Sequence, residues 1–174
     1  LAEAAEATLF LTHPNIAELD ETGEEEGTLF LVEEWLPGVC LEDRLKRAPL
    51  GRAEALSFVK QIAEGLQYLH NNGVVHGDLR PSQILAATDG TLKLTEAGLW
   101  PAFIAARIAL SDVQQDAAYY RAPEYGTNAA PTPASDLYSL GIILYRMLTG
   151  RVPFDGSSPL AIASRHLRDQ PLPP

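Results

Sequence analysis

Three short segments of the chain contain the polar side chains that could do chemistry. They are His76–Leu85 (HGDLRPSQIL), Glu96–Gly98 (EAG) and Ala122–Glu124 (APE). The side chains of the first two segments include carboxylates, which can accept protons. Each segment alone is a weak signal, because an isolated aspartate in a loop is more often solvated than catalytic. Their order along the chain is the stronger observation.

A helix and a hairpin are predicted on either side of the first segment. Apolar residues recur every three to four positions over residues 52–71, which is typical of an amphipathic helix, and Asn72-Gly73 supplies a C-terminal stop. The predicted strands 84–86 and 92–94 flank Asp89-Gly90, as in a β-hairpin. The candidate residues therefore lie between a long helix and a hairpin.

Two further helices are predicted after the APE segment. The first covers residues 135–149, with a cap at its first or second residue and a glycine after its end. It is apolar almost all round, Leu137 included, which predicts the buried centre of a helical lobe. The second covers residues 160–167 and is opened by Ser158-Pro159, with the proline in the first helical turn.

The acidic side chains are concentrated near the start of the chain. Residues 1–50 hold 12 acidic and 3 basic side chains, out of a net charge of −10 for the whole sequence. Nucleic acids and anionic membranes are recognised by basic clusters, so this distribution disfavours both as partners. The acidic run 18–34 ends in a predicted strand, 28–34, and is interpreted as a solvated loop or strand edge. No apolar stretch is long enough to span a bilayer.

The single cysteine, Cys40, makes a disulfide framework impossible. A lone cysteine among apolar neighbours is typical of a small core residue in a reducing compartment, so we expect a cytoplasmic protein. The chain begins at Leu1 in mid-pattern and ends at Pro173-Pro174 just after a predicted helix. We therefore expect part of a domain.

The order of HGDLRPSQIL, EAG, YRAPE and SDLYSLGIILYRMLTGRVPF resembles the catalytic lobe of protein kinases, whose motifs run HRDLxxxxN, DFG and APE. The upstream stretch THPNIAELDETGEEEGTLFLVEEWLPG is similar to the end of a helix, two strands and the hinge of that fold. In short stretches such as HPNI and SPLAIASRHLRDQPLPP, the sequence is most similar to bacterial serine/threonine kinases. The resemblance implies one partial α+β domain: a remnant of the β-rich N-lobe with the hinge, 1–36, and an incomplete, mostly α-helical C-lobe, 37–174.

The resemblance assigns chemical roles to four polar residues. Asp78 falls on the catalytic base, and Arg80 replaces a lysine beside the transferred phosphate. Gln83 replaces the magnesium-binding asparagine and Glu96 replaces the magnesium-binding aspartate, so both metal ligands are one methylene longer. Because magnesium requires near-ideal octahedral ligands at about 2.1 Å, two lengthened ligands predict weak or absent magnesium binding.

The resemblance also implies an ATP pocket at the hinge. Glu34, Leu36 and Leu85 fall on positions that would surround the adenine. Glu33, just before the hinge, stands where the family usually has an apolar side chain, and a carboxylate buried there needs a partner or access to solvent. The Gly-rich loop GxGxxGxV, the strand lysine and its glutamate partner are absent from these 174 residues.

Five residues outside the candidate site are given other expectations. His76 is expected to be a core residue beneath the loop, and Asp136 to hydrogen-bond the loop backbone and cap its helix. Glu124 is expected to pair with an arginine that the family has later in its chain. Trp100 is expected to be a packing residue, and Ser111 is a candidate phosphorylation site.

Two hypotheses for function follow from these departures. The first is a pseudokinase-like module that binds a protein partner through the kinase surface and transfers phosphate poorly or not at all. The alternative is an active serine/threonine kinase that uses ATP and magnesium to phosphorylate protein substrates. A nucleotide-binding sensor without catalysis lies between these two. The sequence identifies neither the partner nor the substrate nor the oligomeric state.

Overall fold

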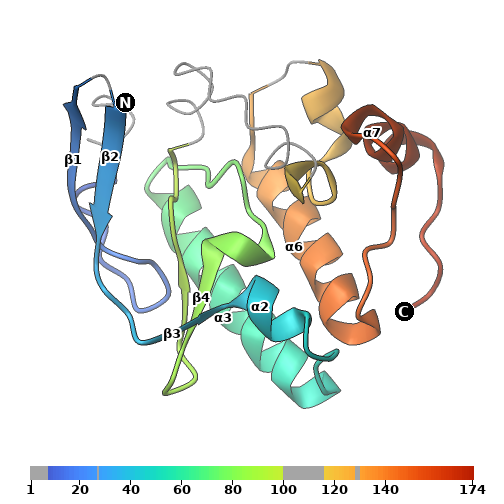
Figure 1. Cartoon of the computed structure of the whole chain (residues 1–174), viewed down its shortest axis with the longest axis horizontal. Helices are drawn as coiled ribbons and strands as arrows, with labels where there is room; N and C mark the ends of the chain where they lie inside the picture. The colour runs from blue at the N-terminus through green and yellow to red at the C-terminus, as the bar shows by residue number, and fades with distance from the viewer. Residues whose placement is uncertain (1–7, 27, 100–115, 128–129) are drawn as a thin grey trace.

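The computed structural model describes residues 8–26, 28–99, 116–127 and 130–174; Trp100 and Ser111 lie outside these ranges. The chain forms a mixed α+β fold in which two small antiparallel sheets lie beside a pair of long helices (Figure 1). The elements are, in order, β1 Leu19–Glu25, β2 Thr28–Glu33, β3 Gly38–Cys40, α2 Leu41–Leu45, α3 Arg52–Asn71, the 3₁₀ turn η1 Pro81–Gln83, β4 Ile84–Ala87, β5 Leu92–Leu94, the 3₁₀ turn η2 Pro123–Thr127, α6 Pro133–Thr149 and α7 Pro159–Arg168.

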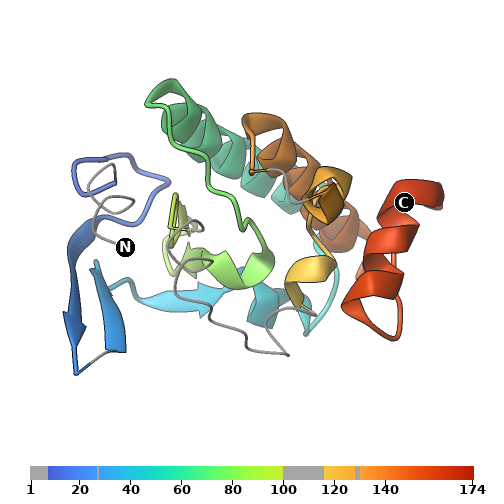
Figure 2. The same ribbon diagram turned by 90° about the horizontal axis from the view of Figure 1, so that it is seen from above.

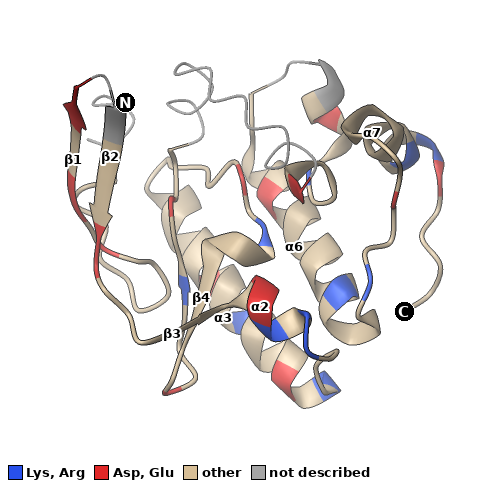
Figure 3. Cartoon of the chain, in the orientation of Figure 1, with Lys and Arg blue, Asp and Glu red and all other residues tan. Residues whose placement is uncertain are grey.

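The acidic run 18–34 forms a two-stranded hairpin at the edge of the molecule. β1 pairs with β2 from Leu19 opposite Glu33 to Glu25 opposite Thr28. The side chains of β1 are mostly exposed, which agrees with the interpretation of this run as a strand edge. The acidic hairpin and α7 lie at opposite ends of the molecule (Figures 2 and 3).

The second sheet has the order β3-β4-β5, and its β4–β5 hairpin is the predicted one. The turn works because Gly90 takes a positive φ of 88° and the Asp89 carboxylate accepts the backbone N–H of Thr91 at 2.9 Å. Residues 15–17 extend this sheet alongside β5, since the backbone N–H of Ala17 donates to the carbonyl of Leu94 at 2.8 Å. The hairpin is thereby fixed on both sides.

Helix α3 has the predicted bounds, and one glycine within it has a packing reason. A β-carbon at Gly65 would lie 2.9 Å from the backbone oxygen of Asn15, so only glycine lets the N-terminal segment pass this close to the helix. Asn15 is itself buried and donates from its side chain to the carbonyl of Leu92 at 2.9 Å. The helix, the N-terminal segment and β5 therefore form one packed unit.

The core lies between α3 and α6, which are neighbours in both views (Figures 1 and 2). α3 contributes fully buried Ile62, Leu66 and Leu69, and α6 contributes Ile143 and Met147. No helix in the described ranges is both long and apolar enough to cross a membrane.

The start of α6 differs from the prediction. The helix is capped by Thr132, whose hydroxyl accepts the backbone N–H of Ser135 at 3.3 Å, and Pro133 occupies the first turn. Ser135 returns a bond to the Thr132 backbone, which completes a capping box. A cap at Ser135 or Asp136 is therefore wrong, because the helix has already begun there. Burial all round is also wrong, since Leu137 is 56% exposed.

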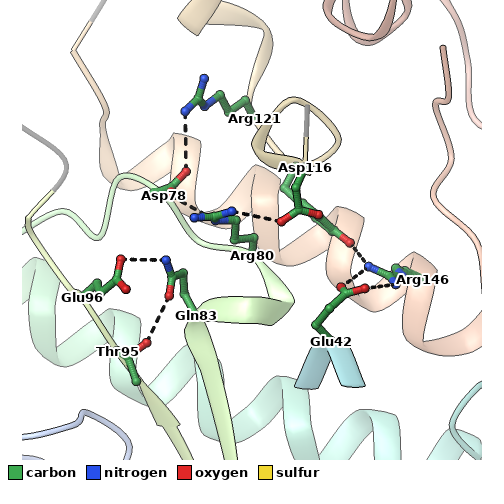
Figure 4. A network of polar contacts seen from close by, with 10 residues as sticks. Glu42, Asp78, Arg80, Gln83, Thr95, Glu96, Asp116, Arg121 and Arg146 are labelled. Carbon is green, nitrogen blue, oxygen red and sulfur yellow. Dashed lines mark hydrogen bonds and ion pairs between the residues drawn. The ribbon is translucent and has the colours of Figure 1, made fainter. Parts of the chain in front are cut away.

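A partly buried ion pair joins α2 to α6. The Arg146 guanidinium donates to both oxygens of the Glu42 carboxylate, at 2.8 and 2.5 Å, and also to the hydroxyl of Tyr120 (Figure 4). Tyr120 is 1% exposed, and burial raises the pKa of its phenol well above the usual range. The network fixes the residue that directly precedes Arg121.

We expect the two apolar residues Ile143 and Leu137 of α6 to respond differently to truncation. Ile143→Ala removes a fully buried side chain and lowers the free energy of unfolding by about 2–5 kcal/mol. Leu137→Ala, on the exposed face, changes it by less than about 0.5 kcal/mol. Urea denaturation of both variants measures the difference. An equal loss for both would contradict the orientation of this helix.

Candidate active site

The loop His76–Arg80 is held in place by one buried carboxylate from α6. Asp136 is 1% exposed, and its two oxygens accept the backbone N–H groups of His76 at 2.9 Å and Gly77 at 3.0 Å. His70 of α3 places its Nε2 2.8 Å from the same carboxylate. The predicted hydrogen bonds from Asp136 to the loop backbone are confirmed.

The burial of His76 and one hydrogen bond to Gly77 complete the shape of this loop. His76 is 0% exposed, and burial lowers the pKa of its imidazole, so it is a neutral core residue as predicted. Gly77 takes a positive φ of 82°, a conformation that costs glycine little. Its carbonyl accepts the Tyr125 hydroxyl at 2.7 Å, which ties the loop to η2.

Asp78 lies between two guanidinium groups (Figure 4). Arg80 Nε is 3.1 Å from Asp78 Oδ2, and Arg121 Nη2 is 3.8 Å from Oδ1. The Asp78 side chain is 14% exposed. Burial raises the pKa of this carboxyl, and the two arginines oppose that rise. The carboxylate is therefore poorly hydrated and stabilised chiefly by its cations.

Arg121 was not among the predicted site residues. It directly precedes Ala122-Pro123-Glu124. A basic residue next to this motif is the feature of the sequence that could have identified it. Arg80, which was predicted, also reaches Asp116, with Nη1 3.0 Å from the carboxylate oxygen. The structure therefore surrounds the candidate base with two cations rather than one.

Gln83 and Glu96, the two positions predicted to bind a metal, are hydrogen-bonded to each other. Gln83 Nε2 donates to Glu96 Oε2 at 2.7 Å, and Gln83 Oε1 accepts the hydroxyl of Thr95 at 3.3 Å (Figure 4). Gln83 is 6% exposed at the end of η1. The amide thus presents its donor, and not its oxygen, to the carboxylate.

The Glu33 carboxylate has the hydrogen-bond partner that its position requires. Its Oε1 accepts the backbone N–H of Glu96 at 2.8 Å, across 63 positions of sequence. Glu96 has a positive φ of 55°, which is uncommon outside glycine and asparagine, so this bond helps to hold an unfavourable backbone conformation. Burial raises the pKa of both carboxyls.

The predicted adenine-pocket residues follow β2 and lie on β4. The Glu34 carboxylate pairs with Lys93 and accepts the backbone N–H of Glu18, the latter at 2.9 Å. Leu36 is half-buried, and Leu85 is paired with Cys40 in the sheet. The nucleotide-binding roles of Glu34, Leu36 and Leu85 stay predictions.

Magnesium is the metal that these side chains have to be tested against. Among the described residues, no group of three or more histidine, cysteine, aspartate or glutamate side chains is placed to hold a metal. Magnesium, however, is usually bound by one or two carboxylates together with substrate phosphates. One carboxylate at Glu96 and the amide of Gln83 fit such a shared site once the amide turns its oxygen towards the glutamate.

Glu124 has a partner within the described residues. Its Oε1 accepts the Ser135 hydroxyl at 2.6 Å, which connects η2 to the start of α6. This contact does not test the expected pair with an arginine, which would lie beyond these 174 residues. It fixes the APE segment against the same helix whose aspartate supports the loop.

Comparison with known proteins shows which family shares this arrangement. The protein kinase domain family matches residues 3–172. Serine/threonine-protein kinase PrkC of Bacillus subtilis is 35% identical over 165 residues, and probable serine/threonine-protein kinase PknB of Lactococcus lactis is 34% identical over 160 residues. Serine/threonine-protein kinase PknA of Mycobacterium tuberculosis is 36% identical over 175 residues.

The chain belongs to the protein kinase domain family and is similar to bacterial serine/threonine kinases. These alignments cover 94%, 91% and 97% of this chain for PrkC, PknB and PknA. They cover only 26%, 26% and 41% of the relatives. The chain therefore spans about a quarter to two-fifths of the length of these relatives.

The raised pKa of Glu33 makes a testable contribution to the pH dependence of stability. A carboxyl whose pKa is higher in the folded state contributes stability that is fully present below its unfolded pKa, near 4.5, and is lost as pH rises through the folded value. Glu33→Gln keeps an oxygen acceptor but has no charge. We expect the stability of this variant relative to wild type to increase between pH 4.5 and pH 7, measured by urea denaturation.

Glu21→Gln is the matched control, because Glu21 is an exposed glutamate of β1. Its stability relative to wild type should stay nearly constant over the same pH interval. A difference between wild type and Glu33→Gln that does not change with pH would contradict the buried position of the Glu33 carboxylate.

Proposed function

We propose that this chain is part of the phosphotransfer domain of a serine/threonine protein kinase that uses ATP and magnesium. The observation that carries the proposal is the convergence of Asp78 and Gln83 from one segment of the sequence with Glu96 from another (Figure 4). The similar proteins PrkC, PknB and PknA are named as serine/threonine kinases, which favours phosphotransfer over a binding module. The substrate is then a protein hydroxyl group.

Asp78 is the residue that would accept the proton from the substrate hydroxyl. Arg80 Nε lies 3.1 Å from Oδ2 and Arg121 Nη2 lies 3.8 Å from Oδ1, so Oδ1 is the less closely paired oxygen and the one that would face a substrate. Its burial raises the carboxyl pKa, which makes the ionised form a better proton acceptor. Bound ATP would supply the phosphoryl group, and bound magnesium would neutralise charge on its phosphates. Arg80 provides a cation beside this position, as the lysine does in the family.

Glu34, Leu36 and Leu85 complete the proposed nucleotide site. Lys93 and the Glu18 backbone occupy the Glu34 carboxylate, and the Glu34 backbone N–H donates to the Glu18 carbonyl at 2.9 Å. Glu34 would therefore contact adenine through its backbone carbonyl. Leu36 and Leu85 would provide apolar contacts to the ring.

Two other features belong to the same proposal. We interpret residues 1–36 as a remnant of the small lobe with the hinge, and residues 37–174 as the helical lobe. Cys40 is partly buried, and burial raises the pKa of its thiol, so it is protonated and poorly reactive at neutral pH. This supports a structural cysteine, and a reducing, cytoplasmic setting stays a proposal.

A pseudokinase that binds a protein partner is the second candidate, and one contact favours it. The Gln83 amide donates to Glu96 at 2.7 Å, so the two metal-ligand positions satisfy each other without a cation. Binding magnesium requires this bond to break and the amide to turn over. Both side chains are also longer than the family's ligands, so they would fit the octahedral geometry of magnesium less well. Both effects would weaken magnesium binding.

Phosphotransfer by the full-length protein tests the first candidate. We expect labelled phosphate from ATP to reach a generic serine/threonine substrate in the presence of magnesium. Asp78→Asn should lower the rate about 10²–10⁴-fold, because it removes the proton acceptor and preserves the shape of the side chain. A rate that is the same for wild type and Asp78→Asn would contradict the role of Asp78.

Shortening both candidate metal ligands separates the two hypotheses. The double variant Gln83→Asn/Glu96→Asp restores the family's side-chain lengths at both positions. If the protein is an active kinase, ATP with magnesium already raises the melting temperature of wild type. The underlying stabilisation is about 2.7 kcal/mol at an ATP concentration of 100 times the dissociation constant. If it is a pseudokinase, only the double variant shows this increase.

A further inference from the structure

Arg80 is a cation that three carboxylates of the site share. Its Nε lies 3.1 Å from Asp78 Oδ2, and its Nη1 lies 3.0 Å from Asp116 Oδ2 (Figure 4). Burial raises the pKa of the Glu96 carboxyl, and the charge of Arg80 opposes this rise. The Arg80 side chain is 11% exposed, so it has little access to solvent. One poorly hydrated guanidinium therefore balances three negative charges.

Asp116 is the carboxylate of this group to which the proposed function gives no role. It lies 36 positions after Arg80 in the sequence. Its backbone carbonyl accepts the N–H of Tyr119 at 3.2 Å, in a short turn that leads to the buried Tyr120. Arg146 of α6 donates to the hydroxyl of Tyr120, so this turn is attached to the body of the protein. The Asp116 carboxylate is therefore presented to Arg80 by an anchored segment.

The contact with Asp116 occupies the cation that the proposed reaction needs. Arg80 would lie beside the phosphate that is transferred, and phosphates and carboxylates accept the same hydrogen bonds from a guanidinium group. If both anions bind Arg80, they repel each other, and if the phosphate replaces the carboxylate, the ion pair with Asp116 is lost. In either case the contact makes binding of this phosphate less favourable.

Exposure indicates which of the two directly bound carboxylates would leave Arg80. The Asp116 side chain is 36% exposed, whereas that of Asp78 is 14% exposed. A charged group that is already partly in water loses its partner at a lower cost than a buried one. Asp116 is therefore the carboxylate that a phosphate would displace, and Asp78 would remain paired.

We propose that the ion pair between Asp116 and Arg80 is an autoinhibitory contact, in which the carboxylate takes the place of the terminal phosphate of ATP until the nucleotide displaces it. The inference rests on the proposed function, because it concerns regulation of that same site. It couples nucleotide binding to the segment 116–121, since Asp116 has to release Arg80 when the terminal phosphate binds. ADP lacks this phosphate and does not require the release.

Nucleotide affinity of the full-length protein tests this inference. Dissociation constants for a non-hydrolysable ATP analogue and for ADP are measured by isothermal titration calorimetry in the presence of magnesium. We expect Asp116→Asn to bind the ATP analogue about fivefold more tightly than wild type does, as for the loss of a competing, partly exposed ion pair. The affinity for ADP should change by less than about twofold, because ADP binds both states of the contact equally well.

Two control variants show whether the effect belongs to this carboxylate. Asp116→Glu keeps the negative charge and should retain the weak binding of the ATP analogue. Asp169→Asn makes the same substitution in an exposed ion pair with Arg165 and should change neither affinity. If Asp116→Asn does not fold, wild type alone decides. Its preference for the ATP analogue over ADP should not exceed about threefold, and a larger preference overturns the inference.

Kinetics distinguish failure of the inference from failure of the proposed function. If the protein phosphorylates a generic substrate, Asp116→Asn should lower the KM for ATP about fivefold. An unchanged or higher KM, with phosphorylation intact, overturns the inference and leaves the proposed function standing. Tighter binding of the ATP analogue to Asp116→Asn supports the inference even in a protein that transfers no phosphate. Binding of neither nucleotide to either form overturns both.

Discussion

The buried carboxylate of Asp136 is the constraint on which the arrangement of the site depends. An ionised group that is 1% exposed is costly unless it is surrounded by donors, and here the donors are two backbone N–H groups of the His76–Arg80 loop and the His70 ring. The same contacts satisfy loop N–H groups that would otherwise be buried without partners. One side chain of α6 therefore fixes the loop that carries Asp78 and joins it to α3.

Around this support, two carboxylates are stabilised in different ways. Asp78 is flanked by the guanidinium groups of Arg80 and Arg121, so its environment is set by charge. Glu96 receives an amide N–H from Gln83, and its own backbone donates to Glu33, so its environment is set by hydrogen bonds. The first arrangement suits a base that must stay ionised. The second has to rearrange before it can bind a metal.

The position of Arg121 follows from the packing of the residue before it. Tyr120 is buried and its hydroxyl is held by Arg146, which also forms the ion pair with Glu42 of α2. Replacing one member of this partly buried ion pair leaves the other charge without its partner, so the network resists change. It connects α2 and α6 to the segment that contacts Asp78.

Local chemistry in the sequence determined α3, the β4–β5 hairpin and the cap of α7 at Ser158, because periodicity, turn residues and caps act over a few positions. The family resemblance identified Asp78 and Gln83, which lie in the same short segment of the sequence. Tertiary structure decided that Thr132, rather than Ser135 or Asp136, caps α6. It also decided the pairing of Glu33 with Glu96, 63 positions apart, since only the folded chain brings such partners within hydrogen-bond distance.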